Sequence, residues 1–83
     1  RLQPNYPNPF SSTTTIAFSL AQNDRITLII QDISGKIIER LADGYYTAGN
    51  YSVTLENKGL KSGIYFYSLT TNYFRETKKL MVK

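Results

Sequence analysis

Six carboxylates are the main side chains that could do chemistry in this sequence, because it contains no Cys, His or Trp. A thiolate zinc site, a Cys–His pair and a Ser–His–Asp triad are therefore excluded. Two carboxylates held close together could still hydrolyse a glycoside, and several together could bind calcium. The six are Asp24, Asp32, Glu39, Asp43, Glu56 and Glu76.

The spacing of these carboxylates argues against both kinds of site. The sequence has no Asp-x-Asp-x-Asp series of the calcium-loop type, and no spacing forces two carboxylates together. Asp24, Asp32 and Asp43 each stand among turn-forming residues, where an Asp side chain bonds nearby backbone. We therefore expect no catalytic site, no metal and no cofactor.

The chain has 83 residues, the size of one small domain. It begins at Arg1 without a basic and apolar leader, so we expect residues 1–83 to be a single domain excised from a larger secreted protein. There is no apolar run near the roughly 18 residues that a membrane-spanning helix needs, so no membrane span is expected.

Apolar residues alternate with polar ones in five short stretches, the period of half-buried strands. Turn-forming residues separate the stretches about every 8–12 positions, which predicts an all-β sandwich or barrel. The apolar stripes are Ile16, Phe18 and Leu20; Ile26, Leu28 and Ile30; Tyr51, Val53 and Leu55; Tyr65, Tyr67 and Leu69; and Leu80 and Val82.

Two hairpins can be predicted from turn chemistry. Asp32 can accept bonds across a tight turn in which Gly35 takes a positive φ, so strands near 25–32 and 36–42 should pair. Asn72 tolerates a left-handed conformation, so strands near 63–71 and 74–82 should form the second hairpin. A further turn is expected at Asp43-Gly44.

The segment Tyr6-Pro7-Asn8-Pro9-Phe10 is rigid and extended, because proline lacks a backbone donor and restricts its predecessor. We expect it to lie across an edge or end of the sandwich, anchored by Tyr6 and Phe10. Leu60 to Tyr65 resembles a tyrosine corner, which predicts a buried Tyr65 whose hydroxyl bonds backbone near Leu60.

These features stand in a characteristic order: Tyr6-Pro7-Asn8-Pro9-Phe10, then Asp32-x-x-Gly35-Lys36, then Gly63-x-Tyr65, then the basic end with Lys78, Lys79 and Lys83. Together they resemble the type A C-terminal sorting domain of the type IX secretion system, over nearly the whole chain. A related immunoglobulin-like domain of the flagellar hook-capping protein shares much of the pattern.

The resemblance implies an all-β, immunoglobulin-like antiparallel sandwich of about seven strands that follows a cargo protein of the Bacteroidota and related lineages. Such a domain passes through the periplasm, is read by the outer-membrane type IX translocon, and is commonly removed by a surface peptidase that attaches the cargo to lipopolysaccharide. The protein would then be secreted or held at the cell surface. By position, the sorting elements are Gly63, Tyr65, Lys78, Lys79 and Lys83, and the structural turn is Asp32 and Gly35.

The net charge is +4, and four of the ten cations lie in the last nine residues, as Arg75, Lys78, Lys79 and Lys83. We expect no nucleic-acid partner, because no binding motif is present and Lys78 and Lys79 would face opposite sides of a strand. Lysines on an edge strand can instead block sheet-to-sheet pairing or take part in recognition by a partner.

The alternative function is a carbohydrate-binding or structural spacer module of a secreted enzyme. Tyr45, Tyr46, Tyr73 and Phe74 lie in or beside expected turns and could stack on sugar rings. We instead expect these aromatics to pack against the core or to make satellite hydrophobic contacts, since seven Tyr with no Trp is less typical of a sugar platform.

Overall fold

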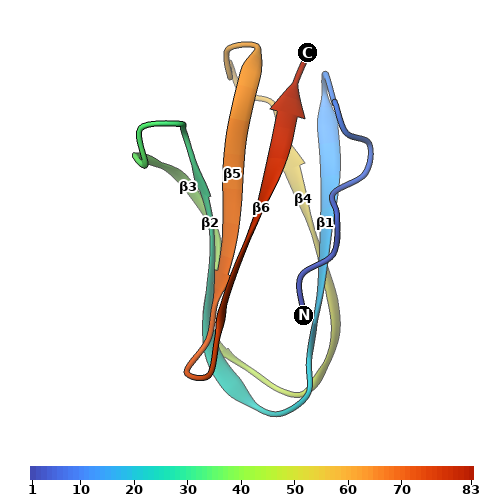
Figure 1. Ribbon diagram of the computed structural model, residues 1–83. Coiled ribbons are helices and arrows are strands. Elements are labelled where there is room, and N and C mark those ends of the chain that lie inside the picture. The colour runs from blue at the N-terminus through green and yellow to red at the C-terminus, as the bar shows by residue number, and fades with distance from the viewer.

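Six strands and no helix make up this protein in a computed structural model that describes residues 1–83 (Figure 1). None of its elements is a helix that could cross a membrane. The strands are β1 (Thr13–Leu20), β2 (Asp24–Gln31), β3 (Ile37–Tyr46), β4 (Gly49–Glu56), β5 (Gly63–Thr70) and β6 (Arg75–Val82).

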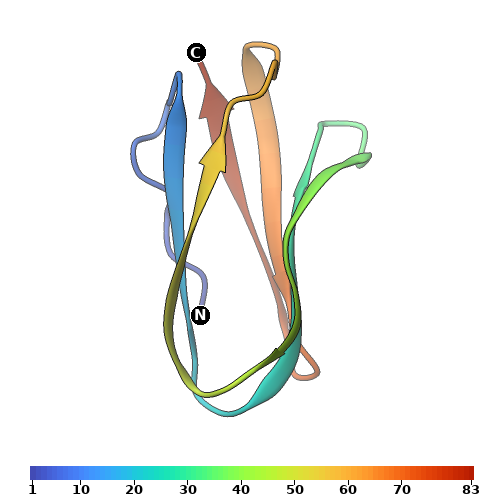
Figure 2. The same ribbon diagram turned by 180° about the vertical axis from the view of Figure 1, so that it is seen from behind.

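The strands form two antiparallel sheets that face each other. One sheet pairs β1 with β4, and the other has the order β3-β2-β5-β6. Figure 2 shows the molecule from behind, with β3 and β4 toward the viewer. The chain crosses between the layers after β1, β3 and β4, as in Greek-key sandwiches. The expected all-β, antiparallel sandwich is confirmed, with six strands where about seven were expected.

The core lies between the two sheets and is built by the alternating stripes. All three apolar residues of each stripe in β1, β2 and β5 are buried, as are Leu80 and Val82 of β6. In β4 only Leu55 is fully buried, while Tyr51 and Val53 lie partly buried against the core. Burial of one face of each strand fixes the register, because a shift by one residue would turn every apolar side chain outward.

The predicted turn at Asp43-Gly44 is wrong. Both residues lie inside β3, where Gly44 pairs with Ile26 and Asp43 with Thr27 of β2. Strand β2 can pair along its whole length only if β3 continues to Tyr46, so sheet pairing overrides the local turn preference. The extended β3 also carries two register shifts opposite β2.

The β5–β6 hairpin forms as predicted, but the role predicted for Asn72 is wrong, because no non-glycine residue has a positive φ. Thr71 shapes the turn instead: its hydroxyl accepts from the backbone N–H of Tyr73 at 3.0 Å and of Phe74 at 3.1 Å. The Asn72 side chain donates to the buried Asp24 carboxylate at 2.8 Å. This bond ties the hairpin to the start of β2.

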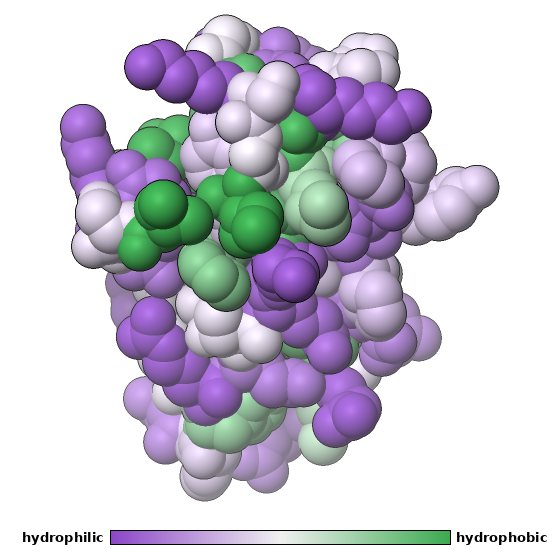
Figure 3. All heavy atoms as spheres, turned by 45° about the horizontal axis from the view of Figure 1, so that its top comes forward, coloured by the Kyte–Doolittle hydropathy of each residue, from purple (hydrophilic) through white to green (hydrophobic).

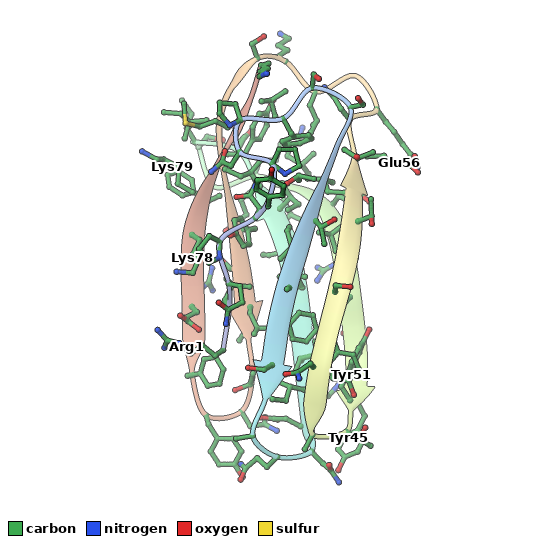
Figure 4. All side chains as sticks on the ribbon, turned by 90° about the vertical axis from the view of Figure 1, so that its right-hand side faces the viewer. Arg1, Tyr45, Tyr51, Glu56, Lys78 and Lys79 are labelled. Atoms are coloured by element: carbon green, nitrogen blue, oxygen red, sulfur yellow. The ribbon has the colours of Figure 1, made fainter.

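The N-terminal segment closes the side of the sandwich between β1 and β6 (Figure 4). Leu2 and Tyr6 form bridges to Phe18 and Thr15 of β1, while the backbone N–H of Leu2 donates to Glu76 of β6 at 2.7 Å. The buried Leu2 side chain belongs to the core. Residues 1–6 therefore seal an opening that the two sheets leave between their edges.

Candidate functional site

The predicted Asp32–Gly35 turn has the expected geometry. The Asp32 Oδ1 atom accepts from the backbone N–H groups of Ser34 at 2.9 Å and Lys36 at 3.0 Å, and from the Ser34 hydroxyl at 2.6 Å. Gly35 has a φ of +90°, which a residue with a Cβ rarely adopts. The Ser34 hydroxyl bond, with the two backbone bonds, lowers the pKa of Asp32 below its usual value.

Tyr65 forms the predicted tyrosine corner. Its ring is buried, and its hydroxyl donates to the Lys61 backbone carbonyl at 2.8 Å, next to Leu60. Gly63 begins β5 with a φ of +140° and faces open space, since a Cβ built there would meet no atom within 4 Å. The corner therefore fixes the 57–62 loop over the start of β5, beside an open backbone.

The basic residues at the end of the chain have different surroundings. Lys78 is half-buried and pairs with Tyr67, whereas Lys79 is exposed and pairs with Phe66 (Figure 4). Lys78 thus lies on the face that also carries Leu80 and Val82, and Lys79 on the outer face. The prediction that these two lysines face opposite sides is confirmed. Lys83 follows β6 and is exposed.

The Tyr6–Phe10 motif lies against the end of β6. Phe10 donates from its N–H to the Met81 carbonyl at 3.0 Å, and its own carbonyl accepts from Lys83 at 2.9 Å. The Asn8 side chain accepts from the N–H of Met81 at 2.9 Å. These bonds cover the edge of the last strand near its end.

Only one of the two predicted anchors holds this motif in place. Phe10 is 1% exposed in the core, but Tyr6 is 80% exposed, so its predicted role as an anchor is wrong. Two buried polar residues anchor the motif in place of Tyr6. The Asn5 amide donates to the Thr14 hydroxyl at 3.0 Å, and that hydroxyl donates to the Pro7 carbonyl at 2.8 Å. The sequence signal was a Thr at an inward position of β1, a place otherwise given to apolar residues.

The motifs that are far apart in the sequence meet at one end of the sandwich, called the upper end below (Figure 1). The β5–β6 register places Gly63 opposite Val82 and Tyr65 opposite Leu80. The Asp32 turn and Gly63 to Tyr65 line the same open groove, and Phe10 pairs with Val82. Lys78 is the predicted site residue farthest from this end, at about mid-strand in β6.

The aromatic residues near the turns differ from one another. Tyr46 packs against the core and meets Tyr51 edge-on, with ring centroids 5.1 Å apart. Tyr45, Tyr73 and Phe74 are exposed, so none of the three packs into the core. Tyr45 and Tyr73 take part in none of the ring contacts. No group of three or more carboxylates could hold a metal ion.

The two facing sheets, the tyrosine corner and the basic last strand define a small antiparallel β-sandwich. The model of the family described as the secretion system C-terminal sorting domain matches residues 5–83, and this chain belongs to that family. No curated protein and no solved structure was found to match the chain. The resemblance seen in the sequence is thereby confirmed.

Membership of this family establishes what the domain is for at a coarse level. A domain of this kind is a C-terminal sorting signal for type IX secretion, which acts on a cargo protein to which it is joined. The protein is therefore secreted or displayed on the cell surface after export across the outer membrane.

Proposed function

We propose that residues 1–83 form one non-catalytic domain at the C-terminal end of a longer protein, and that they direct this cargo through the type IX translocon to attachment at the cell surface. A surface peptidase would release the domain and join the cargo to the cell envelope. The partners are thus the translocon, the peptidase and the cargo.

We place the sorting signal at the upper end of the sandwich, on Gly63, Tyr65, Lys79 and Lys83, with Lys78 farther along the same strand. The observation that carries this proposal is the set of bonds joining Asn8 and Phe10 to Met81 and Lys83, because it unites both ends of the family motif on one surface. Asp32 and Gly35 contribute by shaping the adjacent turn.

The test is surface display of a reporter protein that carries residues 1–83 at its C-terminus, in a bacterium with a type IX system. Removal of residues 74–83 should abolish display, but it also removes the buried Leu80 and Val82, so unfolding alone would explain the loss. The sharper variant is Lys79→Gln with Lys83→Gln, which changes two exposed side chains and leaves the core intact.

We expect the double lysine variant to reduce surface display without changing the unfolding midpoint. The matched control is Arg25→Gln with Arg40→Gln, two exposed cations on β2 and β3 of the same sheet. Equal display of the reporter with and without the domain would contradict the sorting role. That outcome would favour the carbohydrate-binding or spacer module, for which the exposed Tyr45 and Tyr73 are the side chains to test.

A further inference from the structure

The outer face of the four-stranded sheet changes character along its length. Toward the lower end in Figure 1 its outward positions are polar or aromatic, with Thr27 opposite Thr70, Thr70 opposite Arg75, and Tyr45 opposite Arg25. At the upper end several outward positions are apolar: Ile64 pairs with Met81, and Ile37 and Phe66 lie on either side of Gln31. The exposed aliphatic side chains are thus confined to one end, whereas the exposed side chains at the other end are aromatic.

These residues form one patch with the tip of the β2–β3 turn. Ile33 at that tip is 76% exposed, and it lines the same open groove of about 470 Å³ as Ile64. Ile64 is 42% exposed and its partner Met81 is 38% exposed. Figure 3 shows an apolar patch on this end, framed by hydrophilic side chains. We call Ile33, Ile37, Ile64, Phe66 and Met81 the apolar patch.

The patch residues lie outside the core cluster, which is on the other side of the same sheet. An exposed cluster of large apolar side chains with a polar rim is typical of a surface that binds a partner. The groove between Ile33 and Ile64 has the open glycine backbone of Gly63 beside it, so an apolar side chain of a partner could enter it.

The rim of the patch is basic. Lys61 lines the groove, Lys36 precedes Ile37, Lys79 pairs with Phe66, and Lys83 lies two positions beyond Met81. The acid beside the groove is Asp32, whose carboxylate already accepts three bonds within its own turn. Glu39 pairs with the inward-facing Ile30, which places it away from the outer face.

Building on the sorting function, we propose that the apolar patch is the docking surface for a protein of the type IX machinery that has an apolar centre surrounded by carboxylates. Four lysines around an apolar patch complement such a surface in charge and in hydropathy. A second copy of this chain would bring lysines against lysines, and like charges across an interface disfavour it.

The test uses the same reporter fusion with variants of the patch. Ile33→Ser with Ile64→Thr removes apolar surface and keeps residue types suited to a turn and a strand. We expect surface display to fall at least about tenfold, the effect of losing one central contact. The matched control is Tyr45→Ser with Tyr73→Ser, two exposed apolar side chains toward the lower end of the sandwich. It should retain display within about twofold, with both proteins unfolding at similar midpoints.

A second pair of variants tests the charge of the partner. Lys36→Glu with Lys61→Glu should reduce display by a similar factor, whereas Lys36→Arg with Lys61→Arg should retain it. Normal display of the glutamate variant would contradict the proposal that the partner has an acidic rim. Loss of display in the arginine variant as well would also contradict an acidic rim on the partner, because it would show that the partner does not recognise the positive charge.

Each failure has a distinct signature. If the unaltered fusion is not displayed, the sorting function itself fails and the docking proposal falls with it. If the unaltered fusion and the Ile33/Ile64 variant are displayed equally, only the docking proposal fails. Sedimentation of the chain with phosphatidylglycerol vesicles that is lost in the Ile33/Ile64 variant would assign the patch to a lipid surface and overturn a protein partner.

Discussion

The hydroxyl of Tyr67 donates a 2.8 Å hydrogen bond to the backbone carbonyl of Gln3, across 64 positions of the chain. Tyr67 lies fully buried on β5, and Gln3 belongs to the segment that closes the side of the sandwich. A residue in the centre of the large sheet therefore holds the N-terminal segment in place. Burial raises the pKa of the Tyr67 hydroxyl above 10.0, because its charged form is poorly solvated there.

Replacement of Tyr67 by Phe should reduce the free energy of unfolding by about 1–3 kcal/mol at neutral pH, because the Gln3 carbonyl loses its donor in a partly buried place. A raised pKa in the folded state stabilises the fold below pH 10.0, and this is lost as pH rises through the folded value. The difference in free energy of unfolding between the unaltered chain and Tyr67→Phe should thus shrink above pH 10.0, and urea denaturation measures it. A difference in free energy of unfolding that stays constant to high pH would contradict this prediction. The control is Tyr45→Phe, which removes a hydroxyl at an exposed position.

Asp32 should make the stability depend on pH at the acid end. Its pKa is lower in the folded chain than the usual 3.8, so its contribution is present above pH 3.8 and is lost as pH falls through the folded value. Asp32→Asn should be less stable than the unaltered chain at neutral pH, and the difference should narrow in acid. Thermal unfolding from neutral pH to strong acid measures this, with Asp43→Asn on β3 as the control. A stability difference between Asp32→Asn and the unaltered chain that is equal at neutral pH and in strong acid would show that the Asp32 charge is not its source.

The tyrosine corner should be worth about 1 kcal/mol of unfolding free energy, because Tyr65→Phe removes the hydrogen bond to the Lys61 carbonyl and little else. The loop from Asn57 to Ser62 should also exchange its amide hydrogens faster in this variant, since the bond that fixes it is gone. Chemical denaturation and hydrogen exchange report the two effects. Tyr73→Phe changes a hydroxyl with no such bond and should leave both unchanged. Loop exchange that is unaltered in Tyr65→Phe would show that other contacts hold the loop.

Phe10 and Tyr6 should differ sharply although both are aromatic and close in sequence. Phe10→Ala should reduce the unfolding free energy by about 3–5 kcal/mol, because it empties a core position at the end of β6. Tyr6→Ala should change it by less than about 0.5 kcal/mol, since the ring is exposed. Urea denaturation of the two variants side by side provides the comparison. Similar losses in both would mean that Tyr6 has an anchoring contact after all.

Patterns within single strands could be read from the sequence because they depend on local chemistry. The alternation of Ile26, Leu28 and Ile30 reports a strand with one buried face, whatever it pairs with. The Asp32–Gly35 turn is likewise local, since a carboxylate and a positive φ act within five residues. Family membership could also be predicted from the sequence, because the order of the motifs along the chain does not depend on their positions in space.

Tertiary structure decided what lies between distant segments. Tyr6 and Phe10 look equivalent in sequence, but only the bridge to Val82 turns Phe10 inward. The sequence pattern predicts a turn at Asp43-Gly44, but both residues lie in β3 because they pair with β2, which is hydrogen-bonded to β3 along its full length. The lysine-framed apolar patch also depends on the pairing of β5 with β2 and β6, because Ile33, Ile64 and Met81 become neighbours only through that register. Hydrogen-bonded pairing and burial of one face are non-local, so the sequence pattern alone could not specify them.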